Sequence, residues 1–243
     1  MAHKTRKKLT KKEITRAPVG EKLETGLIFI QTHQKEVLGA LIGIVLIILV
    51  GQYLIAKRNT ASEEAMAGFI TAGQLYTQAA SAASMNQLEQ AFQGMDAAYT
   101  MAMQNWNRFP QNDWARKSAV LGAKIDIIRG NYDTAISTLS AVLATDPHES
   151  IKIPALLHMG IVLENRGSEQ DLVNAAASYQ ELLETADHDV MVRAEALHGL
   201  SRVSFARGDN VQSLDYLEQA IALGGDTTTF ENYRMMQLAE QTR

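Results

Sequence analysis

The stretch that decides the fold is residues 115–147, which reads ARKSAVLGAKIDIIRGNYDTAISTLSAVLATDP. In it Ala123 stands seven positions before Gly130, and Ala135 and Leu139 follow four positions apart. A spacing of four places two side chains on the same face of an α-helix. Alanine is abundant here, and it favours helices and permits close packing between them. The stretch therefore predicts helices with closely packed faces.

The same pattern recurs twice downstream. Each copy places a small residue seven positions before a glycine, then a small residue and a large apolar one four apart. The second copy has Gly160, Gly167, Ala175 and Tyr179, and the third has Ser201, Gly208, Ser213 and Leu217. The matched small residues lie 40 positions apart from Ala135 to Ala175 and 38 from Ala175 to Ser213, so the repeats are loose. Helical periodicity extends over residues 60–243 without sustained strand alternation, which predicts an all-α fold.

This spacing resembles the tetratricopeptide repeat, a helix–turn–helix unit in which a glycine turns the chain between two helices. The first copy matches best, because Tyr132 and Pro147 also stand at the expected positions. The second copy has about three extra residues before Ala175 and lacks the final proline, and the third has Gly225 where the proline would be. Residues 60–110 match weakly, as a terminal cap does, and residues 228–241 suggest a closing helix. The resemblance implies a solenoid of helical hairpins.

An uncharged stretch, residues 37–56, precedes this region and reads VLGALIGIVLIILVGQYLIA. Twenty residues of helix rise about 30 Å, which matches the hydrocarbon core of a bilayer. Thirteen of them are Leu, Ile or Val, whose insertion sums to about 4–8 kcal/mol and exceeds the cost of Gln52. A buried core helix usually carries a polar face, and a cleaved signal peptide has a shorter apolar run and a small-residue cleavage site. We therefore predict an uncleaved transmembrane anchor.

The charges on the two sides of this stretch predict its orientation. Residues 1–36 hold nine basic and four acidic residues, a net charge of +5, whereas residues 57–243 hold 14 basic and 23 acidic ones, a net charge of −9. Lysine and arginine next to a span stay on the cytoplasmic side. The prediction is a single-pass bacterial inner-membrane protein whose N-terminus is cytoplasmic and whose C-terminal domain, residues 57–243, is periplasmic.

The segment before the anchor divides into a basic arm, residues 1–19, and an amphipathic juxtamembrane segment, residues 20–36, which either lies along the headgroups or extends the membrane helix. The arm lacks interleaved aromatic residues for base stacking, so attraction to anionic membrane lipid explains its charge and no nucleic acid is expected. Within the anchor, Gly39 and Gly43 form a GxxxG spacing that permits packing against another membrane helix.

No pattern in the sequence points to catalysis. The chain has no cysteine, which excludes disulfides, thiol nucleophiles and cysteine metal sites. Its six histidines form no metal-binding pair, and phosphate-cradling, nucleophile-elbow and dinucleotide motifs do not occur. Asp187-His188-Asp189 offers three metal-ligating side chains, but a polar turn between helices explains it better. We expect a protein that is not an enzyme, without catalytic residues, cofactor or metal.

The tetratricopeptide resemblance implies that the first helix of each unit lines a concave partner-binding groove. Val120 stands where the family's carboxylate clamp has a lysine, so the mixed apolar and charged lining implies an extended or helical peptide instead. Occupation of the groove by the protein's own terminal helices is the alternative. The implied groove residues are Lys117, Val120, Lys124, Ile127, Leu157, Ile161, Glu164, His198, Arg202 and Phe205.

The layout of a basic tail, one membrane helix and a small acidic repeat domain is also similar to the ancillary subunit family of the bacterial SecYEG translocon. This similarity implies a protein-interaction module in periplasmic protein secretion or envelope assembly. Its partners would be translocon subunits, exported chains, chaperones or subunits of an envelope complex. The alternative is a fixed structural subunit of a large membrane-embedded envelope machine.

Overall fold

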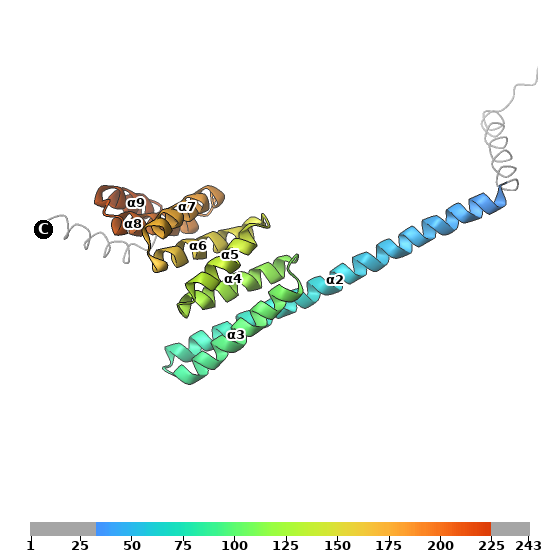
Figure 1. Cartoon of the computed structure of the whole chain (residues 1–243), viewed down its shortest axis with the longest axis horizontal. Helices are drawn as coiled ribbons and strands as arrows, with labels where there is room; N and C mark the ends of the chain where they lie inside the picture. Colours follow the sequence, from blue (N-terminus) through green and yellow to red (C-terminus); the bar gives the residue numbers. More distant parts are fainter. Residues whose placement is uncertain (1–32, 225–243) are drawn as a thin grey trace, which may run out of the picture. The chain divides into compact units, whose positions relative to one another are not determined.

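The computed structural model describes residues 33–224, and within that range every regular element is an α-helix (Figure 1). The predicted all-α class is thereby confirmed for the described residues. The predicted basic arm, almost all of the juxtamembrane segment and the predicted closing helix lie outside them. The helices are α2 (Gln34–Ser84), α3 (Leu88–Arg108), α4 (Asp113–Ile128), α5 (Tyr132–Leu143), α6 (Glu149–Arg166), α7 (Glu169–Thr185), α8 (Val190–Ala206) and α9 (Asn210–Ala222).

The chain divides into two units, residues 1–59 and 60–243. In the first unit, α2 carries the uncharged stretch. From Ile42 onward this helix is long and apolar enough to cross a membrane, and none of its most apolar window is buried. Large apolar side chains from Ile42 to Ile55 each expose more than half of their surface, including Ile47 at 74%. Exposed apolar patches of this extent require an apolar partner or solvent.

The second unit consists of the remaining α2 residues and α3 to α9. Within it each helix from α3 to α9 packs against the next one, and α4 also contacts α6 while α6 contacts α8. The turns α4–α5, α6–α7 and α8–α9 contain Gly130, Gly167 and Gly208 with φ of 76°, 72° and 82°. Only glycine adopts this left-handed conformation without steric cost. Each hairpin thus turns at the glycine around which the sequence pattern is arranged.

Small residues set the distance between α2 and α3. Ala65, Ala72 and Ala79 on α2 are buried at intervals of seven residues, as are Ala91 and Ala98 on α3. A seven-residue interval keeps successive residues on one helix face. Alanine at every interval lets the two backbones approach closely, because its side chain is a single methyl group.

Asn105 continues the buried alanine interval on α3 and joins three helices. Its Nδ2 donates to the Ala65 carbonyl oxygen of α2 at 2.8 Å and to Ser118 Oγ of α4 at 2.7 Å. Gly68 provides the room, because a Cβ there would lie 2.8 Å from Asn105 Cγ. Both donor positions of this buried amide nitrogen are used, so its burial carries little of the cost of an unsatisfied polar group.

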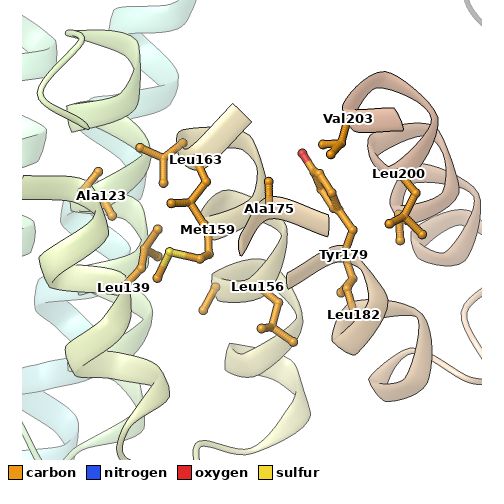
Figure 2. Packing of buried hydrophobic residues seen from close by; sticks show 14 of the residues in the cluster. Ala123, Leu139, Leu156, Met159, Leu163, Ala175, Tyr179, Leu182, Leu200 and Val203 are labelled. Carbon is orange, nitrogen blue, oxygen red and sulfur yellow. The ribbon is translucent and has the colours of Figure 1, made fainter. Parts of the chain in front are cut away.

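The core of the second unit runs through α4 to α9 and is built around Tyr179 (Figure 2). Tyr179 lies on α7 and is fully buried. A Cβ added to Gly160 on α6 or to Gly199 on α8 would lie 2.5 Å from its ring, which real Cβ atoms essentially never do. The ring therefore inserts between α6 and α8, where each helix has a glycine facing it.

Candidate partner-binding surface

The ten predicted groove residues lie on α4, α6 and α8, as the resemblance implies for first helices. Two of them, Val120 and His198, are buried, each with 6% of its surface exposed. The other eight are partly exposed. Val120 and His198 therefore serve packing more than contact with a partner, and the remaining eight stay predictions as binding residues.

A single face of α4 presents Lys117, Leu121, Lys124 and Ile128, which recur at helical intervals opposite the buried face. Lys117 Nζ lies 4.6 Å from the centroid of the Trp114 ring, and Lys124 Nζ lies 4.9 Å from that of Tyr76 on α2. An ammonium group over an aromatic face is held by the ring quadrupole. The ammonium group of each lysine on this surface is thus held by a cation–π contact with an aromatic ring.

An ion pair joins α6 to α8 on the same set of helices. Arg202 Nε donates to Glu164 Oε1 at 2.6 Å and Arg202 Nη2 donates to Glu164 Oε2 at 2.9 Å. Bidentate pairing of a guanidinium with a carboxylate is among the stronger charged hydrogen-bonding arrangements. The two side chains expose only 17% and 20% of their surface. Glu164 and Arg202, both predicted from the sequence as separate groove residues, are therefore brought together.

Tyr179 forms hydrogen bonds with both members of the Glu164–Arg202 pair. Its hydroxyl donates to Glu164 Oε2 at 3.0 Å and accepts a bond from Arg202 Nη2 at 3.3 Å. Burial raises the pKa of Tyr179, and the Glu164 carboxylate raises it further. Tyr179 is not among the predicted groove residues, because the resemblance assigns the groove to the first helix of each unit and Tyr179 lies on a second helix. One signal was available, because Tyr179 carries a hydroxyl where the other two copies have Leu139 and Leu217.

Two histidines occupy similar places on α6 and α8 beside cations. Burial lowers the pKa of His158 to about 4, and the charge of Lys124 lowers it further. The pKa of His198 is also lowered to about 4, mainly by burial and then by Arg202. His198 Nδ1 lies 3.1 Å from Arg202 Nη1, and since guanidinium is only a donor, Nδ1 accepts. Both rings are neutral at neutral pH.

The Asp187-His188-Asp189 sequence forms a turn between α7 and α8. Asp189 caps α8, with its Oδ1 accepting from the backbone N–H groups of Met191 and Val192, both at 3.1 Å. His188 is almost fully exposed. Within residues 33–224 no group of three ligating side chains is placed to hold a metal ion. The turn borders a hollow of about 630 Å³ between α6 and α8.

The anchor glycines are open to their surroundings. A Cβ added at Gly39 or Gly43 would meet no atom within 4 Å. Their role in packing against another membrane helix stays a prediction.

Comparison of the chain with protein-family models gives no match, and comparison with curated proteins gives none. The tetratricopeptide and translocon-subunit resemblances therefore rest on the sequence pattern and the layout alone.

Proposed function

We propose that this protein is a membrane-anchored interaction module: α2 crosses the bacterial inner membrane, and a tetratricopeptide-like solenoid in the periplasm binds other proteins in secretion or envelope assembly. The observation that carries the proposal is the contrast within α2. Its segment Ile42–Ile55 exposes apolar side chains all round, whereas Ala65, Ala72 and Ala79 further along the helix are buried. A helix that is apolar all round is stable in lipid or in a core, and among residues 33–224 no core surrounds this segment.

The contacts among the later helices support the solenoid part of the proposal. Stacked hairpins bury a continuous core when each unit packs on its neighbours. The second unit has this contact pattern, since α4 touches α6 and α6 touches α8 in addition to the contacts within hairpins. The partly exposed residues of α4, α6 and α8 then form one surface of mixed apolar and charged character.

Topology is tested with single cysteines, because the natural chain has none and each introduced thiol is a unique reporter. The two reporters are Ala2→Cys in the arm and Ser137→Cys at an exposed position of α5. A membrane-impermeant maleimide added to cells with a permeabilised outer membrane should label Ser137→Cys, and label Ala2→Cys only after lysis. Labelling of Ala2→Cys in unlysed cells would refute the orientation.

Partner binding is tested by site-specific photocrosslinking in intact cells. A photoreactive residue at Ile161 or Phe205 reports on the groove, and one at Val173 or Val211 reports on exposed positions of α7 and α9. We expect adducts with translocon subunits, chaperones or exported chains from the groove positions and none from the controls. Equal adducts from both sets would refute the groove as the binding surface. Groove adducts that contain no secretion component would refute the role in secretion.

A fixed structural subunit of an envelope machine is the second candidate, and the open positions at Gly39 and Gly43 favour it. Substitution of both by leucine blocks the close backbone approach that a GxxxG spacing permits. If the protein is a fixed subunit, mild-detergent extraction yields a stoichiometric complex that the Gly39→Leu/Gly43→Leu variant loses. Extraction of a lone protomer from the unaltered protein would count against this candidate.

A further inference from the structure

The outer face of α4 differs in charge from the helices that follow it. Residues 113–147 carry four basic and four acidic residues, whereas residues 148–224 carry five basic and twelve acidic ones. Two of the four cations, Lys117 and Lys124, lie seven residues apart on the same face of α4, which separates their Cα atoms by about 10 Å along the axis. The α4 face is thus a cationic region on an otherwise acidic domain.

Neither lysine is neutralised by a carboxylate among residues 33–224. Each ammonium group instead lies over a ring, Trp114 or Tyr76, which fixes its position without using all three of its N–H donors. Two held cations with unused donors form a surface that is prepared for negatively charged groups.

The neighbouring groove charges on α6 and α8 are arranged differently. Glu164 and Arg202 neutralise each other in their bidentate pair, and Glu195 acts on Arg202 as a further negative charge. His158, beside Lys124, is neutral at neutral pH. The predicted groove therefore has two positive charges at Lys117 and Lys124, a Glu164–Arg202 pair that is neutral as a whole, and the apolar side chains of Leu157 and Ile161 on α6.

From this charge distribution we propose that the groove takes an acidic peptide segment, with two or more carboxylates on Lys117 and Lys124 and apolar side chains on α6. This inference rests on the proposed function, since it names the chemistry of the partner. Opposite charge attracts such a segment to Lys117 and Lys124 on α4.

The test selects short random peptides on the full-length protein in lipid nanodiscs and then measures the affinity of the enriched peptides. We expect enrichment of peptides with at least two Asp or Glu residues. The double variant Lys117→Met/Lys124→Met keeps the aliphatic contacts with the rings but removes both charges. Each lost charge should weaken binding about threefold to fivefold, and high salt should weaken binding to the unaltered protein.

Three further variants make each outcome decisive. Arg207→Met removes an exposed cation at the end of α8 and should leave affinity unchanged, and Lys117→Arg/Lys124→Arg should restore it. Ile161→Gln alters the α6 part of the groove. Circular dichroism and the unfolding midpoint check that each variant folds.

The failure of this inference differs from the failure of the proposed function. Neutral or basic enriched peptides whose binding still falls in Ile161→Gln would overturn the acidic partner but keep the groove. Peptides whose binding is insensitive to Ile161→Gln and to both lysine substitutions would overturn the groove as well.

Discussion

Two regions of this molecule place their apolar side chains in opposite surroundings. The segment Ile42–Ile55 of α2 exposes its isoleucine, leucine and valine side chains, whereas Leu139, Leu182 and Leu217 in the hairpins are fully buried. The first region has no polar face and so has no side that water favours. The second alternates apolar and polar residues at helical spacing, so neighbouring helices cover one face. The comparison shows that a helix with no polar face is left exposed along its apolar length, whereas helices with a polar face are covered by their neighbours on the apolar one.

The largest expected effect comes from charging the exposed region. The double substitution Ile44→Arg/Ile48→Arg should cost about 5–7 kcal/mol of membrane insertion, because each arginine costs about 2.5–3.5 kcal/mol at the centre of a membrane helix. Carbonate extraction should then release the protein from membranes. The matched control is Val211→Arg at an exposed position of α9, and this variant should stay in the membrane fraction. Retention of the double variant would show that α2 is not the anchor.

The next effect comes from shortening the same side chain in each region. Leu182→Ala removes a fully buried side chain and should lower the free energy of unfolding by about 2–5 kcal/mol, because the lost contacts leave a cavity. Leu49→Ala should leave the unfolding of the hairpins unchanged, since its side chain is exposed and lies in the other unit. Chemical denaturation in detergent measures both. Equal losses would mean that Leu49 is also part of the hairpin core.

The stability of the folded protein should depend on pH because of His158. Its pKa in the folded protein is about 4, below the usual value of 6.5, so the unfolded chain binds more protons between these two values. Stability is therefore full above about pH 6.5 and falls as the pH decreases toward 4, by about 3 kcal/mol. Denaturation midpoints measured across this range should show the decline. His158→Gln should flatten it, with His198 retaining a decline in the same direction.

The smallest effects compare two glycines. Gly160→Ala places a methyl group against the Tyr179 ring and should destabilise the hairpins by about 1–3 kcal/mol. Gly73→Ala on α2 meets open space within a helix and should stabilise by up to about 1 kcal/mol. Thermal unfolding distinguishes the two signs. Equal effects would show that the Tyr179 ring can move aside at no cost.

The hairpin turns could be predicted because glycine at a left-handed position is a local requirement. Gly130, Gly167 and Gly208 each end a helix by adopting positive φ, which depends on the residue itself and its immediate neighbours. The apolar stretch of α2 was predictable for the same reason, since its length and lack of charge are properties of consecutive residues.

The candidate groove was only partly predictable. Lys117 and Lys124 were identified from their positions in the repeat, but the rings beneath them come from α2 and from the preceding turn of α4. Val120 and His198 were predicted as lining residues and are buried instead, because helical periodicity does not give the width of the exposed stripe. That width depends on how closely the neighbouring helices approach.

The sequence by itself determined the helical class, the glycine turns, the apolar helix and the division of charge on its two sides, because each depends on short-range periodicity or composition. Only the tertiary structure decided that Tyr179 inserts between Gly160 and Gly199 and that Glu164 pairs with Arg202, 38 residues away. Contacts of this kind depend on the distance and rotation between packed helices. Those quantities are set jointly by every side chain in the interface, and no local pattern contains them.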